Sequence, residues 1–583
     1  MGKYDFDPTA YLDQLNKIIE YIQQDDEFNY KSLRKILTKY PKDDQGLFSK
    51  DELVAGYRTL LDKGLISEDP ELLTRLRMKP TRSISGVTIV TVLTKPFPCP
   101  GHCIYCPNDV RMPKSYLSDE PGAQRAERND FDPYLQTYNR LLALKNIGHN
   151  VNKIELIILG GTWSFYPEHY QIWFVKECFR AMNDFEIRDG RKDIQTKIIT
   201  EEADRIPAMG EDGRLRSYNE IMSLVEKQEG KRLLDPTESA TWEELTKQHS
   251  QNEHALSRCV GLVIETRPDY IDEEEAVRLR RLGATKIQIG IQTLDDEIQT
   301  LNMRGHGRKE TENAIKILRL AGFKIHGHWM PNLHGSTVEK DIRDYQRLWE
   351  SEISPDELKI YPTSIIEHTE LFELYKRGKY LPYSYDELLS VLTSIMPKTP
   401  RYCRLTRVVR DIPSPDIVAG NKLTNFRQIV EEQLKKDGNP CQCIRCREIK
   451  ETTIRAKDLE KEVIEYTTPV SREFFLSFRT KDTDKITGFL RLSLPTVKNF
   501  QTELEGESMI REIHVYGQVV GIGTRSEGRP QHLGQGSSLI ELAKGISKKA
   551  GYDGMAVISS IGTREYYRKK GFENGELYQH MRF

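Results

Sequence analysis

The chain has 583 residues, of which 38% are hydrophobic and 30% are charged, a composition typical of a globular protein with several domains. Its 86 basic and 88 acidic residues nearly cancel, so total charge does not indicate a nucleic-acid partner, which would need local basic patches. The sequence has neither the apolar region of a signal peptide nor a run of about 18 apolar residues, which predicts a cytoplasmic protein without membrane contact.

The first 80 residues are expected to form a helical domain. Apolar residues at helical spacing predict a helix over residues 11–23, with Leu12, Leu15, Ile18 and Ile22 on one face. Near the end of this domain the sequence becomes locally basic. The basic residues are Arg75, Arg77, Lys79 and Arg82.

Residues 81–400 alternate short apolar strands with amphipathic helices. The expected strands are 87–93, 154–159, 262–266, 286–291, 324–330 and 358–361. Helices over 273–282 and 310–321 lie between them, and each is followed by a glycine that ends it. This alternation predicts a parallel sheet, open or closed into a barrel, with its chemistry at the carboxyl ends of the strands.

Three cysteines follow the first of these strands on one loop. Cys99, Cys103 and Cys106 have C-x3-C-x2-C spacing, so three thiolates can bind three irons of a [4Fe–4S] cluster and leave the fourth iron for a small molecule. The spacing resembles that of the radical S-adenosylmethionine (SAM) enzymes, which implies that this molecule is SAM and that its cleavage yields a 5′-deoxyadenosyl radical. A zinc site with His102 or a remote residue as fourth ligand is the alternative. Tyr105 and the α/β domain that follows fit the radical enzymes better.

Glycines and polar residues end several of the predicted strands. They are Gly160, Gly161 and Thr162 at one strand, then Arg267, Gln292 and Lys359. The glycines match the SAM-binding motif of that superfamily, because they let the backbone approach a ligand's ammonium group closely. The arginine can pair with a carboxylate through two donors, and a desolvated lysine inside a barrel can donate a proton or hold an anion. Taken singly, each is also compatible with an ordinary ion pair or turn.

Two segments depart from this alternation. Residues 187–257 are highly charged and poor in apolar positions, which predicts an exposed insertion, helical around 218–229. Residues 401–460 form a connector rich in cysteine and arginine. Its thiols are Cys403, Cys441, Cys443 and Cys446. Four sulfurs would close a tetrahedral zinc site, which is a simpler interpretation than a second iron–sulfur cluster.

Arginines gather around the cysteines of the connector. They are Arg404, Arg407, Arg410, Arg445 and Arg447. A solvated face is one interpretation of such a group. Because these arginines crowd around a metal site, they instead indicate a strip that binds phosphates.

The sequence becomes β-rich from about residue 465 and then enters a glycine loop. Gln531, Gly534 and Gly536 precede a helix predicted over 539–550, and the amides of a helix N-terminus can bind a pyrophosphate. The loop follows one predicted strand, 512–516, and its helix leads into a second.

This order of strand, glycine loop, helix and strand resembles the GNAT acetyltransferases. The resemblance implies that the loop binds the pyrophosphate of CoA and that Tyr566 and Tyr567 lie near the acetyl group. A dinucleotide-binding fold is the competing interpretation, but it needs a glycine fingerprint directly after its strand.

A radical SAM domain, a cysteine-rich connector and a GNAT domain in one chain resemble the Elp3 family, which provides the catalytic subunit of Elongator. The resemblance runs from about residue 79 to the C-terminus. Matching segments are 95–107, 128–136, 265–269, 304–306, 410–413, 511–517 and 564–568. Two features depart from the family: the insertion at 187–257 is longer than expected, and Ser257 stands where histidine is commoner.

The resemblance implies carboxymethylation of C5 of the wobble uridine, U34, in tRNA. Acetyl-CoA would donate the two-carbon unit, and a SAM-derived radical would activate it, in a chain that also holds a [4Fe–4S] cluster and Zn²⁺. Basic residues at 75–82 and 404–410 would hold the anticodon stem-loop, with U34 unstacked into the radical pocket. Lys359 would be a lysine of the radical site, and Elongator-type accessory subunits or a second copy of the chain would be partners.

The expected fold is α/β: a radical SAM partial (β/α) barrel, a zinc-stapled linker and a GNAT-type α+β domain. The predicted domains are 1–80, 81–400, 401–460 and 461–583. Two other functions remain open, a protein lysine acetyltransferase whose iron–sulfur domain is structural and a non-catalytic scaffold that binds tRNA. Complete ligand sets at all three sites favour the tRNA enzyme.

Overall fold

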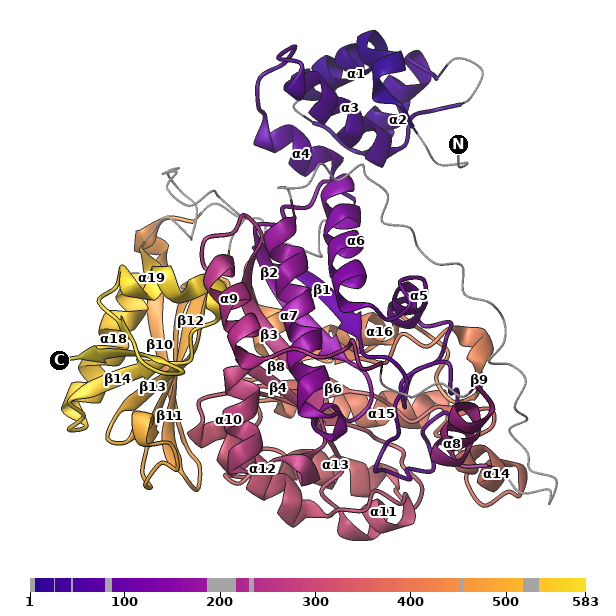
Figure 1. Ribbon diagram of the computed structural model, residues 1–583, viewed down its shortest axis with the longest axis vertical. Coiled ribbons are helices and arrows are strands. Elements are labelled where there is room, and N and C mark those ends of the chain that lie inside the picture. Colours follow the sequence, from indigo (N-terminus) through magenta and orange to yellow (C-terminus); the bar gives the residue numbers. More distant parts are fainter. Residues whose placement is uncertain are drawn as a thin grey trace.

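The molecule has three parts, an N-terminal helical lobe, a central α/β domain and a C-terminal sheet beside it (Figure 1). The computed structural model describes residues 6–25, 27–42, 46–78, 86–185, 216–229, 235–450, 454–516 and 534–583. Among these residues, no helix is long and apolar enough to cross a membrane.

The N-terminal lobe is the helical domain that the sequence predicts. Its elements are a 3-10 turn at Pro8–Tyr11 and helices α1 Leu12–Gln24, α2 Tyr30–Lys39, α3 Lys50–Asp62 and α4 Pro70–Leu76. The apolar face of α1 is fully buried, with Leu15, Ile18 and Ile22 at 0% exposure. Asn29 and Asp69 begin two of the helices by accepting hydrogen bonds from the first-turn amides, which otherwise lack partners.

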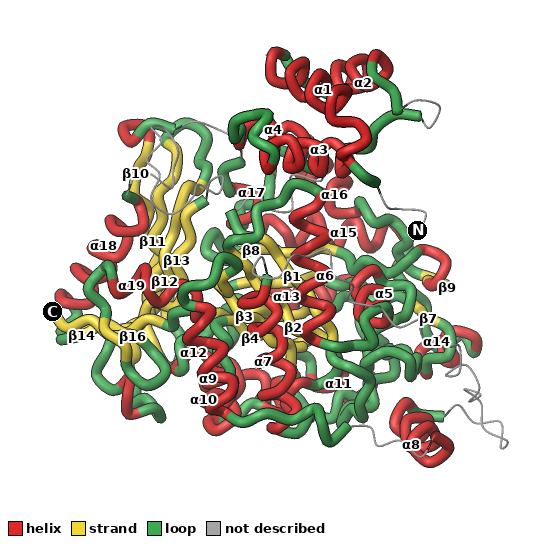
Figure 2. Tube along the Cα trace, turned by 45° about the horizontal axis from the view of Figure 1, so that its top comes forward, coloured by secondary structure: helices red, strands yellow, loops and turns green. Residues whose placement is uncertain are grey.

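The central domain is built on a seven-stranded parallel sheet. Its strands are β1 Thr88–Leu93, β2 Lys153–Leu159, β3 Arg258–Thr266, β4 Lys286–Gln292, β5 Lys324–Trp329, β6 Glu357–Ile360 and β8 Arg404–Val408. They lie in the order β1-β2-β3-β4-β5-β6-β8, so the sheet is open and its two edges are β1 and β8. This arrangement confirms the predicted parallel sheet. Because β1 and β8 do not pair with each other, the sheet forms a partial barrel and not a closed one. Figure 2 separates its strands from those of the C-terminal sheet.

Helices cover this sheet and fill the connections between its strands. They are α5 Pro121–Glu127, α6 Pro133–Asn146, α7 Glu168–Asp184, α8 Tyr218–Glu229, α9 Trp242–Asn252, α10 Glu273–Arg281, α11 Asp296–Leu301, α12 Arg308–Leu320, α13 Val338–Arg347, α14 Glu370–Lys376, α15 Tyr385–Ile395, α16 Phe426–Lys436 and α17 Ile444–Arg447. Two short strands, β7 Ile365–Ile366 and β9 Ile417–Ala419, pair apart from the main sheet. Parallel strands need such long crossovers, which explains the spacing seen in the sequence.

The domain boundary predicted at residue 400 is wrong, because the sheet gains its last strand beyond it. β8 pairs in parallel with β6 and places Leu405 opposite Leu358 and Arg404 opposite Glu357. Two arginines among its five residues, Arg404 and Arg407, made this strand look like part of a polar connector. They are accommodated because one face of β8 looks into a polar cavity described below.

The exposed insertion predicted over 187–257 is also wrong for the residues that the structure describes. Helix α9 packs against α7 and buries Leu245, His249 and Asn252. Asn252 donates to the carbonyl of Ser257 and accepts from the amide of Cys259, which joins α9 to β3. The burial of this helix could not be predicted from hydrophobic periodicity, because two of its three buried side chains are polar.

The C-terminal domain holds a second seven-stranded sheet. Its strands are β10 Leu459–Thr467, β11 Ser471–Thr480, β12 Ile486–Pro495, β13 Ser508–Val515, β14 Gly554–Val557, β15 Glu573–Asn574 and β16 Gln579–Arg582. Neighbours are antiparallel except for β13 and β14, which are parallel and are linked through helix α18 Gln535–Lys549. The short helix α19 Arg564–Arg568 follows β14. A break between two parallel strands leaves a notch in which a ligand can meet the helix N-terminus.

A buried network of charges joins the two sheets. Asp356, which immediately precedes β6, accepts two hydrogen bonds from Arg511 of β13, both at 2.7 Å. Arg491 of β12 lies 3.4 Å from the same carboxylate, and Glu473 lies 2.8 Å from Arg511. All four side chains are at most 2% exposed, so the domains share a solvent-free contact.

Candidate functional site

The three cysteines of the first cluster lie on the loop after β1, near the carboxyl ends of the parallel strands. Cys99 and Cys103 are buried, and Cys106 is half-buried and lines a large cavity. The hydrogen bond with Cys106 and the nearby guanidinium groups of Arg304 and Arg267 lower the pKa of Cys103 well below 9.0, although burial opposes this. Thiolates are the form that binds iron, so the donor set fits a [4Fe–4S] cluster.

Arg304 was not among the predicted site residues, although it contacts the cysteine loop directly. Its Nη1 lies 3.3 Å from Cys103 Sγ, and its Nη2 donates to the carbonyl of Gly290 at 2.8 Å. Burial opposes the charge of this arginine, but nearby Tyr105 and the thiols of Cys103 and Cys106 raise its pKa. A fixed cation at this position stabilises the negative charge of a thiolate-bound cluster. The segment 304–306 was noted in the sequence only as a family match.

The glycine motif ends β2 beside the cysteine loop, as predicted. Thr162 Oγ1 lies 3.7 Å from Cys99 Sγ, so the motif and the loop face one another. Gly160 has φ +151, and a Cβ there would lie 1.9 Å from Thr94 Oγ1. Only glycine can therefore occupy this position without moving β1, and the bare backbone at Gly161 stays available to a ligand.

The other two predicted SAM contacts lie at the same edge of the sheet. Arg267 makes its bidentate pair with Asp269, at 2.9 and 2.8 Å, rather than leaving it for a ligand carboxylate. Its remaining nitrogen, Nη1, would be 2.2 Å from a Cβ at Gly101 and so lies directly against the cysteine loop. Gln292 has a positive φ of 62, and its buried Oε1 has no hydrogen-bond partner among the residues that the structure describes. Its side chain lies against Gly290, as does that of Arg304, so this acceptor is near the guanidinium that contacts Cys103 and fits a donor group of a bound ligand.

Lys359 faces the interior of the sheet, as predicted. Its Nζ donates to Gln288 Oε1 at 2.5 Å, and His328 Nε2 lies 2.9 Å from the same oxygen. Polar side chains at alternate positions of β4 and β5 share this interior. They are Lys286, Gln288, Lys324, His326 and His328. Their period of two was the signal in the sequence, because strands of a parallel sheet covered by helices are normally apolar on both faces.

Burial of the Lys359 side chain destabilises the folded protein by an amount that depends on pH. Burial lowers its pKa from 10.5 to about 8, and nearby Arg407 and Lys286 add to this. The unfolded chain binds this proton more tightly, so the free-energy cost is fully present below pH 8 and disappears as the pH rises towards 10.5. We therefore expect Lys359→Met to raise the unfolding free energy by up to about 3 kcal/mol at pH 7 and by little at pH 10.

Urea denaturation of the two proteins across this pH range measures the difference. Lys435→Met is the matched control, since Lys435 is an exposed lysine at the rim of the same cavity. It should change stability equally at both pH values. A constant difference between the wild type and Lys359→Met would contradict the prediction.

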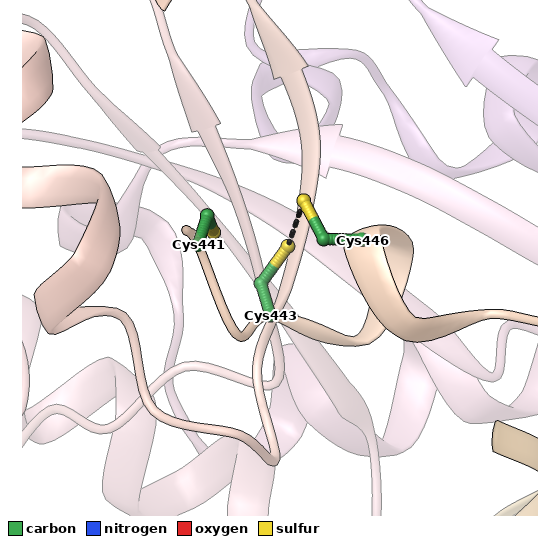
Figure 3. Close-up of side chains that lie close together, drawn as sticks. All are labelled: Cys441, Cys443 and Cys446. Carbon is green, nitrogen blue, oxygen red and sulfur yellow. Dashed lines mark hydrogen bonds between the residues drawn. The ribbon is translucent and has the colours of Figure 1, made fainter. Parts of the chain in front are cut away.

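Three cysteines of the connector converge on one point (Figure 3). The sulfurs of Cys441, Cys443 and Cys446 all lie within 4.8 Å of one another. Hydrogen bonds with Cys441 and Cys446 lower the pKa of Cys443 well below 9.0. Three clustered sulfurs, one of them readily ionised, fit a structural Zn²⁺ ion.

Cys403 does not belong to this group, which corrects the four-cysteine ligand set. Among the described residues, the sulfurs that lie together are the three of 441–446. Cys403 immediately precedes β8, is fully buried, and accepts from the amide of Ile444 through its carbonyl. Its thiol packs in the apolar core, where burial raises its pKa.

The basic residues predicted to hold phosphates have mostly internal partners. Arg404 pairs with Glu448 at 2.7 Å, Arg410 pairs with Glu120 at 2.6 Å, and both line the cavity. Arg407 is the most exposed of the three, at 46%, and pairs with Asp411 in a way that solvent weakens. Arg404 and Arg410 therefore hold the sheet to neighbouring loops, and phosphate binding by the arginines around the connector stays a prediction.

Arg75 and Arg77, the described members of the N-terminal basic group, do not line this cavity. Arg75 donates to the carbonyls of Ile22 and Asp25 and closes the helical lobe. Arg77 donates to the carbonyl of Gly148, which attaches the lobe to the central domain. Lys79, Arg82 and, in the C-terminal domain, Gln531 lie outside the described residues.

The glycine loop of the C-terminal domain opens at the N-terminus of α18. Gly534 has φ +68 and begins the helix, in a conformation that favours glycine. A Cβ at Gly536 would lie 2.5 Å from the hydroxyl of Tyr566, so this tyrosine covers the first turn. Lys570 donates to Ser537 at 2.6 Å, which adds a cation to the positive end of the helix. Tyr567, by contrast, is 5% exposed and packs in the core of its domain.

One cavity connects the cysteine loop with this helix. It has a volume of about 2340 Å³ and lies between the central sheet and β13, α18 and α19. Cys106, Gln292 and Lys359 line one side, and Gly536 and Tyr566 line the other. The sequence left open how two such sites could communicate, because no local pattern records which faces of two domains meet.

Comparison with known proteins agrees with this geometry. The model of the radical SAM superfamily matches residues 208–345, and that of the radical SAM C-terminal domain matches 355–436. A protein of Methanocaldococcus jannaschii named tRNA uridine(34) acetyltransferase is 37% identical over 519 residues, which are 86% of each chain. Elongator complex protein 3 of Homo sapiens is 32% identical over 86% of this chain and 85% of its own.

A solved structure shares both the fold and the sequence. The archaeal Elp3 of Methanocaldococcus infernus, with an N-terminal deletion, superposes with a TM-score of 0.66 at 32% identity. The match covers 86% of this chain and 100% of the other. A radical SAM domain implies SAM and a [4Fe–4S] cluster as cofactors, and the cysteine loop is where this chain would hold them. The chain is an enzyme of the radical SAM type, and it belongs to the Elp3 family.

Proposed function

We propose that the chain carboxymethylates C5 of the wobble uridine of tRNA, with acetyl-CoA as the donor of the two-carbon unit. The observation that carries this proposal is the single cavity, lined by Cys106 and Gln292 on one side and by Gly536 and Tyr566 on the other. A reaction that needs a radical and an acyl group at one base requires both sites to open into the same space. The names of the relatives supply the substrate, tRNA uridine 34.

The residues of the central domain would prepare the radical side. SAM, when bound at the cluster, supplies a 5′-deoxyadenosyl radical that can remove a hydrogen atom from the acetyl methyl group. Arg304 would stabilise the charge on Cys103, and Gln292 would offer its unpartnered oxygen to a ligand. Lys359, whose pKa is about 8, would place its own ammonium group near the uracil carbonyls or donate a proton to them.

The residues of the C-terminal domain would hold the acyl donor, as in a GNAT fold. The amides that begin α18, with Lys570 beside them, would bind the pyrophosphate of CoA. Tyr566 is 40% exposed and can contact the thioester. Tyr567 is buried in the core, and its ring packs edge-on against the ring of Tyr566. The new bond would join the acetyl methyl carbon to C5 of the uracil. One hydrogen would leave the methyl carbon as part of 5′-deoxyadenosine, the hydrogen of C5 would leave as a proton, and SAM would be the oxidant for the two electrons released. Water would then hydrolyse the thioester, release CoA and leave the carboxylate on the base.

The tRNA would enter through the open part of the cavity. Arg407 is the cation that we expect to meet a phosphate, since its pair with Asp411 is exposed. Zn²⁺ at Cys441, Cys443 and Cys446 would keep the connector rigid next to this opening. Elongator-type accessory subunits, a homo-oligomer and the cytoplasmic location stay predictions from the sequence.

Labelled acetyl-CoA tests the proposal. The chain is reconstituted with iron and sulfide without oxygen, given SAM, a reductant, methyl-labelled acetyl-CoA and tRNA, and the nucleosides are analysed. We expect label in 5-carboxymethyluridine at position 34 only when SAM is present. A chain with an intact cluster that yields no labelled nucleoside would overturn the proposal. Acetylated lysine on an added protein would instead support the acetyltransferase alternative.

A further inference from the structure

We propose that helix α8 caps the cysteine loop and that Asn219 is a positioning residue for Cys99. Asn219 Nδ2 donates to the carbonyl of Cys99 at 2.8 Å, and Asn219 Oδ1 accepts from the amide of the same cysteine at 3.0 Å. One side-chain amide thus makes both hydrogen bonds that a neighbouring strand would make. The backbone of the first cluster cysteine is held by a residue 120 positions away.

Helix α8 is anchored firmly enough to hold this loop. Tyr218 is 2% exposed, and its hydroxyl donates to the carbonyl of Met112 at 2.7 Å. Ile221 and Met222, each 3% exposed, bury the next turn of the helix. Ser217 and Glu220 hydrogen-bond one another across the first turn, which fixes where the helix starts.

The segments that flank α8 contact the same loop on both sides of the cysteines. Lys95, four residues before Cys99, forms an ion pair with Glu238. Asn108, two residues after Cys106, donates to the carbonyl of Arg216 at 3.4 Å. The segment that was predicted to be an exposed insertion therefore contacts the cysteine loop before the three cysteines, at Cys99 and after Cys106.

This contact gives the loop one covered side and one open side. Cys99 is 8% exposed and Cys103 is 6% exposed, whereas Cys106 lines the large cavity. A cluster held by these thiols would be reached by solvent through the cavity that Cys106 lines, whereas Asn219 of α8 holds the backbone of Cys99 and does not line that cavity. Oxygen attacks exposed cluster sulfides and irons, so a cap that keeps Cys99 in place should slow cluster loss.

The inference rests on the assignment of the cluster to Cys99, Cys103 and Cys106. It does not depend on the carboxymethylation of tRNA, because its measurements concern iron alone. A wild-type chain that binds no iron would refute the cluster site itself. A wild-type chain with iron but without tRNA activity would refute the proposed function and leave the cap intact.

Iron retention in air tests the cap in the full-length protein. Wild type, Asn219→Leu and Asn219→Asp are reconstituted without oxygen, and the loss of iron is followed after exposure to air. Asn219→Leu removes both hydrogen bonds and should lose iron about tenfold faster, with an altered electron paramagnetic resonance spectrum of the reduced cluster. Asn219→Asp keeps the acceptor for the Cys99 amide, so its rate of iron loss should lie between those of the other two proteins, at about three times the wild-type rate.

Ser223→Ala is the matched control, because Ser223 lies exposed on the same helix. It should retain iron as the wild type does. Equal rates and spectra for Asn219→Leu and the wild type would overturn the cap. If Asn219→Leu does not fold, Asn219→Asp decides: wild-type retention with a wild-type spectrum overturns the proposal, and faster loss supports it.

Discussion

Cys103→Ala is expected to abolish tRNA modification while leaving acetyl-CoA binding unchanged. Cys103 is the most strongly activated thiol of its loop, with Arg304 Nη1 3.3 Å from its sulfur. Two remaining thiols cannot hold a cluster in which three irons need protein ligands. Without the radical the proposed removal of a hydrogen atom from the acetyl methyl group cannot occur, so the rate should fall by at least about a thousandfold.

Three measurements on one preparation check this expectation. Iron content should fall to background, labelled 5-carboxymethyluridine should disappear, and acetyl-CoA affinity should match the wild type. Cys178→Ala is the matched control, because Cys178 is a fully buried thiol on α7, outside both cysteine groups. Modification that survives in Cys103→Ala would mean that the radical SAM domain is structural, and an acetyltransferase reaction would then be the better proposal.

The order of strands and helices in the central domain could be predicted because each element carries its own signal. β2 and β4 begin and end within about one residue of the expected 154–159 and 286–291. Isoleucine or leucine recurs at least at every second position of these strands, and glycine or helices with clear capping residues bound them. β8 was missed because its pattern, with arginines at 404 and 407, reflects the polar cavity that it faces and not its pairing with β6.

The candidate site was predictable where its chemistry is local in sequence. Three cysteines on one loop, and a glycine pair at one strand end, need no knowledge of the rest of the fold. Contacts between distant segments were not predictable, as Arg304 at Cys103 and Asn219 at Cys99 show. Cys403 shows the opposite error, because it was grouped with the other connector cysteines by sequence while the sulfurs that lie together are those of 441–446.

The shared cavity depends on a feature that no motif records, the way the two domains are fixed to each other. Asp356, at the start of β6, binds Arg511 and Arg491 of the C-terminal sheet through its carboxylate. Burial opposes ionisation of this carboxyl, but Arg511 and Arg491 hold its pKa below its usual value of 3.8. Its contribution to stability is therefore fully present above pH 3.8 and is lost as the pH falls below that value.

Asp356→Ala is expected to lower the unfolding free energy by about 3–5 kcal/mol at pH 7. The substitution leaves two guanidinium groups buried between the domains, with Glu473 still paired with Arg511 and Glu512 still paired with Arg491. Urea denaturation measures the loss. Glu465→Ala is the matched control, since its pair with Arg472 is nearly half exposed and should be worth less than about 1 kcal/mol.

The same substitution separates a shared reaction from two independent ones. Acetyl-CoA should still bind the C-terminal domain of Asp356→Ala at a temperature where the protein is folded, because Gly536 and Tyr566 lie within that domain. Labelled 5-carboxymethyluridine should fall more steeply than acetyl-CoA binding, since the two walls of the cavity are then no longer held by Arg511 and Asp356. Equal losses of binding and of modification would argue that the contact only stabilises the fold. A loss of modification alone would make the interface between the domains part of the catalytic apparatus.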